Sequence, residues 1–246
     1  MSSIQFNLQR LHALSLGLES PESWELWRTQ NHRWPDSGSL PQCNAIPAMM
    51  KRRMSTISKL AVQVASELTQ ESKVDFVIFA SRHGELERST SLLKEIQRGQ
   101  PASPTAFSQS VHNTAAGLFT IANSMQVPAT SLAACEDTFH CALTEASIFL
   151  DEHKNSQVLV VDFDAPLPHP YDEFEKQMFK PYALGLLLTH GDDVSIKRDI
   201  LQPRLTEKKE QPLPQALSFY SKWLGEWYDF QIDSTRQSWH WNIKKT

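Results

Sequence analysis

Three short runs of apolar residues stand out along the chain, and each has the length of a β-strand. They are VDFVIFA (74–80), QVLVVDF (157–163) and YALGLLLTH (182–190). Their apolar residues are continuous rather than alternating, which is typical of strands buried on both faces, as in parallel sheets. A further strand is predicted over the small-residue run PATSLAAC (128–135).

Helical periodicity separates these strands. Apolar residues recur every three to four positions, and one segment ends just before a glycine, where helices commonly stop. The segments are 48–70, 85–97, 110–125 and 136–153. Strands that alternate with helices predict an α/β layer fold, with a mainly parallel or mixed sheet flanked by helices.

The two ends of the chain lack this pattern. We expect residues 1–47 to be irregular, with tryptophans covering one edge of the core. The region from about 203 to 246 is predicted to be a polar tail around one aromatic amphipathic segment, 217–230. Its aromatic residues either close the chain's own core or cover a partner. We expect residues 1–246 to form a single domain.

Composition narrows the classes of function. Hydrophobic residues make up 40% of the 246 residues and the net charge is −4, so the chain is an ordinary globular protein and not a generic nucleic-acid binder. No apolar run approaches about 18 residues, and we expect no membrane span, no signal peptide and a cytoplasmic location. Cys43, Cys135 and Cys141 show neither metal-ligand nor disulfide spacing, and we expect no metal and no cofactor.

Cys135 is the candidate nucleophile. It lies between a predicted strand and a predicted helix, where free N–H groups and the helix dipole favour a thiolate. The charges of Glu136 and Asp137, which follow it, disfavour the thiolate. His112 and His140 are the nearest histidines in sequence, and neither makes a convincing base by its position alone. Cys135 is therefore either a small buried residue or a site of acylation.

A cluster of positive charge forms a second candidate site. Lys51, Arg52 and Arg53 fall in the first turns of the predicted helix 48–70, where positive charge opposes the helix dipole. The cluster is either solvated surface or a binding site for an acidic partner.

One part of the sequence resembles a known family. FSQSVHNTAAGLFTIANSMQVPATSLAACEDTFHCALTEA (107–146) is similar to the core of a β-ketoacyl-ACP synthase, in which a strand like SLAAC carries the nucleophilic cysteine. Over about residues 20–190 the chain resembles the short chain-length-factor proteins of aryl polyene pathways. The resemblance implies a thiolase-like fold reduced to a single N-terminal half.

The differences from a complete synthase shape the functional hypothesis. The family's C-terminal half supplies two histidines in motifs like HGT and NHxFGG, and neither motif occurs in this sequence. The resemblance therefore implies a non-catalytic chain-length factor that pairs with a complete β-ketoacyl-ACP synthase and receives chains on acyl carrier protein (ACP). Its pathway would be polyketide or aryl polyene biosynthesis. The alternatives are a Cys135-dependent acyltransferase or thioesterase, and an ACP-binding module that uses Lys51–Arg53.

The resemblance also implies roles for individual residues. Two subunits of the family pair across a strand, so the partner interface would include the strand 128–134 and the helix 110–125. Cys135 would be vestigial. The acyl tunnel would be lined by His83, Leu86 and Phe107, and the partner would contact His112, Asn113, Gly117, Thr130 and Leu132.

Overall fold

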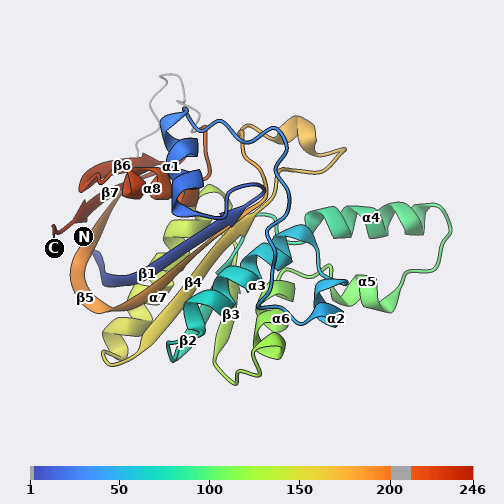
Figure 1. The fold of residues 1–246 in the computed structure, drawn as a ribbon, viewed down its shortest axis with the longest axis horizontal. Coiled ribbons are helices and arrows are strands. Elements are labelled where there is room, and N and C mark those ends of the chain that lie inside the picture. Colours follow the sequence, from blue (N-terminus) through green and yellow to red (C-terminus); the bar gives the residue numbers. More distant parts are fainter. Residues whose placement is uncertain (1–2, 201–211, 246) are drawn as a thin grey trace.

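A mixed β-sheet runs through the part of the chain that this computed structural model describes, residues 3–200 and 212–245 (Figure 1). Within it, seven strands form one sheet in the order β3-β2-β4-β5-β7-β6, and β1 pairs with β5. β2 is parallel to β3 and β4, and the other pairs are antiparallel. The strands are β1 (Ile4–Ser15), β2 (Phe76–Ala80), β3 (Ala129–Leu132), β4 (Gln157–Asp164), β5 (Tyr182–Ile200), β6 (Asp229–Asp233) and β7 (Gln237–Ile243).

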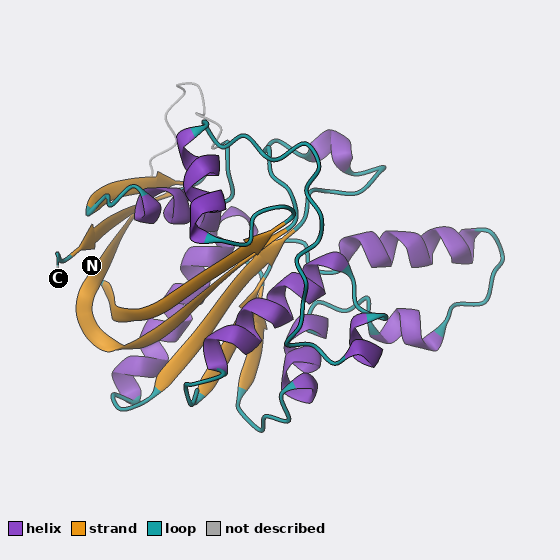
Figure 2. Cartoon of the chain, in the orientation of Figure 1, coloured by secondary structure: helices purple, strands orange, loops and turns teal. Residues whose placement is uncertain are grey.

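Helices cover both faces of this sheet (Figure 2). Those in the described residues are α1 (Pro21–Thr29), α2 (Ala48–Lys51), α3 (Thr56–Thr69), α4 (Leu86–Gln97), α5 (Pro104–Ser108), α6 (Thr114–Ala122), α7 (Thr138–Glu152) and α8 (Gln215–Leu224). α3 and α6 contribute to the core on one face, and α7 and α8 to the core on the other. The predicted mixed sheet flanked by helices is confirmed. None of the described helices combines the length and apolar character that crossing a membrane requires.

The strand β2 shows why its sequence is continuously apolar. Phe76, Ile78 and Ala80 belong to the core beneath α7, whereas Val77 and Phe79 belong to the core beneath α3 and α6. All five residues are buried, which confirms the prediction of a strand covered on both faces.

The prediction of an irregular N-terminus is wrong. Ile4–Ser15 forms β1 and Pro21–Thr29 forms α1. β1 escaped detection because its pairing with β5 contains two register shifts, which disturb the alternation of apolar and polar residues. α1 begins at Ser20, whose side chain accepts the N–H of Ser23, and Trp24 and Trp27 are buried against the core.

The predicted helix 48–70 is two helices. α2 ends at Lys51, and α3 starts after Ser55, whose hydroxyl accepts the N–H of Ser58 as an N-cap. Arg52 and Arg53 are therefore exposed residues of the connecting turn and do not lie in the first turns of a long helix. The helix dipole therefore gives no reason to expect a partner for Lys51, Arg52 and Arg53.

The C-terminal residues complete the sheet. The first part of the predicted tail, 203–211, lies outside the described residues. After α8, the strands β6 and β7 form an antiparallel pair, and β7 also pairs with the second half of β5. Trp227 is exposed and Tyr228 is half-buried, but most of the other large aromatic side chains close the chain's own core. The fully buried ones are Phe219, Trp239 and Trp241.

Candidate functional site

The turn after β3 holds Cys135 at the surface. A short 3₁₀ turn, Cys135–Asp137, connects this edge of the sheet to α7. Cys135 has a φ of 53°, a conformation that is uncommon for residues other than glycine and that clusters at functional sites. Its thiol is exposed, so the expectation of a small buried residue is wrong. The thiol therefore lies at the surface, between β3 and α7.

Both candidate bases, His112 and His140, are hydrogen-bonded to residues other than Cys135. His140 is buried, its Nδ1 lies 2.6 Å from Gln215 Oε1, and its Nε2 accepts the indole N–H of Trp241 at 3.0 Å. Burial lowers the pKa of His140 to about 4, so the ring is neutral. His112 Nε2 lies 2.8 Å from the carbonyl oxygen of Ser81. In the described part of the chain, no hydrogen bond joins either ring to Cys135.

Asp137 has a structural role that the sequence did not reveal. It is buried, and its two carboxylate oxygens accept four hydrogen bonds of 2.8–3.0 Å from side chains of the C-terminal residues. The donors are Gln215, Ser234, Gln237 and Trp239. All lie 78 to 102 positions away in sequence, so no local pattern could have indicated them.

Glu136 binds the same part of the chain. Its carboxylate accepts the backbone N–H of Thr235 at 2.8 Å and also the Thr235 hydroxyl. Thr235 lies in the turn between β6 and β7. The acidic pair after Cys135 is therefore an attachment point for the C-terminal strands, in addition to any effect on the thiol.

The carboxylate of Asp164 holds the turn after β2 in place through three hydrogen bonds. One carboxylate oxygen accepts the hydroxyl of Ser81 at 3.0 Å and the N–H of His83 at 3.2 Å, and the other accepts the N–H of Arg82 at 2.7 Å. Gly84 in this turn has a φ of 55°, and a Cβ there would come within 2.9 Å of His112. The turn therefore has one well-defined shape.

The three expected tunnel residues are only partly brought together. His83 and Leu86 line the same small cavity, whose volume is about 20 Å³, enough for about one water molecule. Phe107 lies on α5 with 63% of its surface exposed and does not line that cavity.

The residues expected at a partner interface lie on the edge strand β3, on α6, which contacts β3, and just before α6, where His112 is held by Ser81. β3 is the last strand on this side and carries Thr130 and Leu132, both half-buried. Asn113 and Gly117 are exposed at α6, and a Cβ on Gly117 would meet no atom of the described residues within 4 Å apart from its own helix backbone. The outer edge of β3 carries unpaired backbone groups, which can pair with another strand.

Two buried carboxyl groups lie near the end of β4. Asp162 accepts the hydroxyl of Tyr182 at 2.6 Å, and Asp164 holds the turn described above. Burial raises the pKa of Asp162 to about 8 and that of Asp164 to about 6. Among the described residues, no three His, Cys, Asp or Glu side chains are grouped as a metal site requires.

Stability should fall as the pH rises from about 6.5 to 8. The pKa of Asp162 is about 8 in the folded chain and about 3.9 in an unfolded one, so the folded chain binds more protons in this range. Each such proton changes the free energy of unfolding by about 1.4 kcal/mol per pH unit. His140 acts in the opposite direction only below about pH 6.5.

Urea denaturation at constant ionic strength measures this slope. Asp162→Asn should flatten it, because a carboxamide has no proton to lose. Asp229→Asn, which changes an exposed carboxyl group, should leave it intact. If the free energy of unfolding depended on pH equally in the Asp162→Asn variant and in the parent chain, Asp162 would not be the group that loses its proton in this range.

Comparison with known proteins identifies relatives of this chain. The family model for the N-terminal domain of β-ketoacyl synthases matches residues 24–242. A chain in the structure of the ketosynthase ApeO in complex with its chain length factor ApeC, from Xenorhabdus doucetiae, is 30% identical with a TM-score of 0.86. The match covers 97% of this chain and 99% of that one. No curated protein matches the sequence.

Two more distant structures share the fold. The ishigamide ketosynthase/chain length factor is 13% identical with a TM-score of 0.64, and the match covers 80% of this chain and 67% of that one. A β-ketoacyl synthase from Burkholderia phymatum is 10% identical with a TM-score of 0.60, covering 82% of this chain and 66% of that one. The predicted thiolase-like fold, as a single N-terminal half, is confirmed.

Proposed function

The chain belongs to the β-ketoacyl synthase family, and on this basis we propose that it is a non-catalytic chain-length-factor subunit. It pairs with a complete β-ketoacyl-ACP synthase and shapes the tunnel that holds the growing acyl chain. The pathway is polyketide or aryl polyene synthesis, a chemistry related to fatty-acid synthesis, in the cytoplasm. The substrates arrive on acyl carrier protein.

The observation that carries this proposal is the match in length. The chain corresponds to 99% of its relative in the ApeO–ApeC complex, but to only 66% of the Burkholderia phymatum synthase. The relative is therefore shorter than the Burkholderia phymatum synthase, which favours its identification as the chain length factor of that complex and not as the ketosynthase. A likeness at 30% identity over the whole length supports the same role here.

The edge strand supports pairing with a synthase. Within the described ranges β3 pairs on one side only, and Gly117 lies in open space on the neighbouring helix α6. A partner strand added to β3 would continue the sheet across the interface, with its main-chain hydrogen bonds replacing those to water. The interface residues would be His112, Asn113, Gly117, Thr130 and Leu132.

The tunnel would be completed between the two subunits. The cavity beside His83 and Leu86 is too small for an acyl chain, so these side chains would contribute one wall and the partner the rest. Phe107 is exposed on α5 and would contact the partner or its acyl chain from this side. A wall set by a few side chains limits length sterically, because each further two-carbon unit must fit without overpacking.

The surroundings of Cys135 support a role without condensation chemistry. His140 uses both ring nitrogens in bonds to Gln215 and Trp241, and His112 is held by Ser81. A nucleophilic cysteine needs an adjacent base or another means of activation. The exposed thiol and positive φ of Cys135 favour one second candidate, an acyltransferase or thioesterase that acts on acyl-ACP.

Replacing Cys135 with alanine tests these two functions against each other. In a reconstituted pair with the synthase, Cys135→Ala should change the condensation rate by less than about twofold, whereas removal of the partner's own nucleophile abolishes it. The measurement is product formation from acyl-ACP and malonyl-ACP. A loss of about a hundredfold, ~2.7 kcal/mol in the barrier, with the pair still assembled would favour the cysteine-dependent enzyme.

A further inference from the structure

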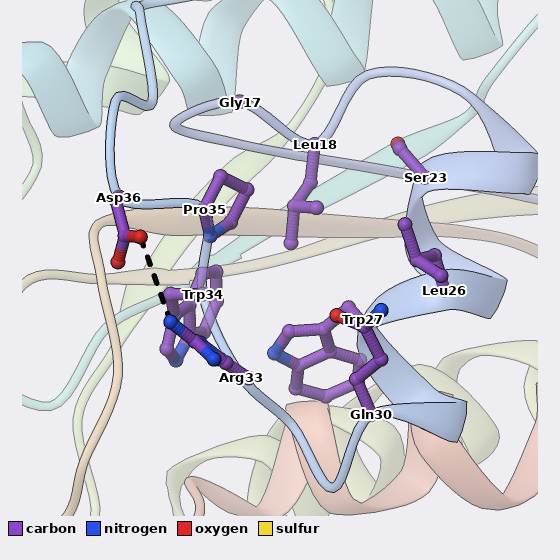
Figure 3. A pocket seen from close by; sticks show the side chains of 10 residues that line it. All are labelled: Gly17, Leu18, Ser23, Leu26, Trp27, Gln30, Arg33, Trp34, Pro35 and Asp36. Atoms are coloured by element: carbon purple, nitrogen blue, oxygen red, sulfur yellow. Dashed lines mark ion pairs between the residues drawn. The ribbon is translucent and has the colours of Figure 1, made fainter.

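A pocket of about 310 Å³ lies between α1 and the segment that follows it (Figure 3). Its lining ranges from buried side chains, such as Leu18 and Trp27, to exposed ones, such as Gln30 and Arg33. It shares no lining residue with the cavity beside His83, and it is formed by residues 17–36, far in sequence from β3 and Cys135. Its volume is at the lower end of the range for small-molecule sites.

The backbone around this pocket is tightly constrained. Gly17 has a φ of 75°, and a Cβ there would come within 2.9 Å of the Gly38 Cα. The N–H of Gly17 donates to the carbonyl oxygen of Ser39 at 2.9 Å. The chain beyond Pro35 is therefore held directly against the turn after β1, which keeps the walls of the pocket in place.

Two indole groups in the pocket, those of Trp27 and Trp34, lack a hydrogen-bond partner among the described residues. Trp24 donates its indole N–H to the carbonyl oxygen of Ala13 at 3.0 Å, whereas the buried Nε1 atoms of Trp27 and Trp34 have no partner in the part of the chain that the structure describes. Trp27 is only 1% exposed, and Figure 3 shows its indole nitrogen directed toward the side where Arg33 and Trp34 lie. An unsatisfied buried donor costs about 1–3 kcal/mol, which an acceptor on a ligand would recover.

A positive charge lies at the exposed end of the pocket. The guanidinium of Arg33 is 3.6 Å from the carboxylate of Asp36, and both side chains are more than 70% exposed. Such an exposed ion pair contributes little free energy, so the guanidinium is free to exchange one carboxylate for another. The rest of the lining is mostly apolar, with Leu18, Leu26, Trp34 and Pro35, and its polar side chains are Ser23 and Gln30.

We propose that this pocket binds a small monocarboxylate with an apolar body. The carboxylate accepts the indole N–H of Trp27 and pairs with the guanidinium of Arg33, which gives two charge-assisted hydrogen bonds. The apolar body lies against Leu18, Leu26 and Trp34. The site is separate from the partner edge and from Cys135, so it exists whether or not the chain is a chain-length factor.

Nuclear magnetic resonance of the full chain with ¹⁵N-labelled tryptophan tests the proposal, with phenylacetate as the probe. Trp27→Phe assigns the indole N–H signal of Trp27. Phenylacetate should shift that signal and saturate below about 10 mM, whereas the indole signal of Trp239, which donates to Asp137 and does not line the pocket, stays in place. No shift of the Trp27 signal up to that concentration would overturn the proposal.

The role of the Arg33 charge is tested with phenylacetamide, a neutral probe of the same shape as phenylacetate. Arg33→Gln, at an exposed position, should weaken phenylacetate binding about tenfold and leave binding of phenylacetamide unchanged. Equal weakening of both probes, or of neither, would overturn the assigned role of Arg33 in carboxylate recognition. Assembly with a synthase is not required in any of these measurements, so their failure leaves the proposed function standing.

Discussion

Gly117→Leu is expected to weaken the pairing of this chain with its synthase by about ten- to a hundredfold, without unfolding the chain. Beyond its own helix backbone, a Cβ at Gly117 meets no atom of the described residues within 4 Å, so the added side chain is tolerated in isolation. At an interface where α6 lies close to the partner, the same side chain would overpack the contact. Overpacking typically costs about 1–3 kcal/mol, which corresponds to that loss of affinity.

Calorimetric titration of the chain with the synthase measures this loss. Glu145→Leu is the matched control, because it adds an apolar side chain of the same size to the exposed surface of α7, on the other face of the sheet. The control should bind with unchanged affinity. If the Gly117→Leu variant bound as tightly as the parent chain, α6 would not lie at the interface.

The interior of the sheet could be predicted from the sequence because its signal is local. β2 and β4 are continuous apolar runs, since helices cover both of their faces, and that burial determines the residue types directly. β1 gave no such signal, because register shifts against β5 break its alternation. The division of the helix predicted over 48–70 could have been found from Ser55, a favoured N-cap residue three positions before Ser58.

The environment of Cys135 could be predicted only in part. Its place between a strand and a helix follows from local pattern, and the structure agrees. The contacts that decide its chemistry are long-range, since His140 binds Gln215 and Trp241, which are 75 and 101 positions away. From the sequence, Glu136 and Asp137 are expected only to disfavour the thiolate. Their hydrogen bonds to the C-terminal residues depend on the fold and could not be predicted from local pattern.

Those bonds explain how the C-terminal strands are held to the rest of the chain. Two elements meet at the start of α7: the turn that carries Cys135, and the unit formed by α8, β6 and β7. The aromatic side chains of this unit pack on α7 as well, with Trp239 stacked on His140 and Trp241 on Phe139. The carboxylate of Asp137 bonds to side chains on both α8 and β7.

Removing that carboxylate should therefore lower the stability of the whole chain strongly. Asp137→Ala leaves the buried indole N–H of Trp239 and the amide N–H of Gln215 without their acceptor, and breaks two further bonds. Loss of a buried, hydrogen-bonded charge of this kind typically costs about 3–5 kcal/mol. Urea denaturation followed by tryptophan fluorescence measures the loss, and Trp239 is one of the seven tryptophans that contribute to the signal.

Two neighbouring variants separate this role from a general effect of the acidic turn. Asp137→Asn should recover most of the stability, because its carbonyl oxygen can still accept from Trp239 and Gln215. Its amide N–H can donate to Gln237 once the Gln237 side-chain amide turns over and presents Oε1, a buried atom without a partner among the described residues. Glu136→Ala removes bonds to Thr235 alone, at an exposed position, and should cost less than about 1 kcal/mol. If Asp137→Ala were no more destabilising than Glu136→Ala, the C-terminal strands would be held by their aromatic packing and not by this carboxylate.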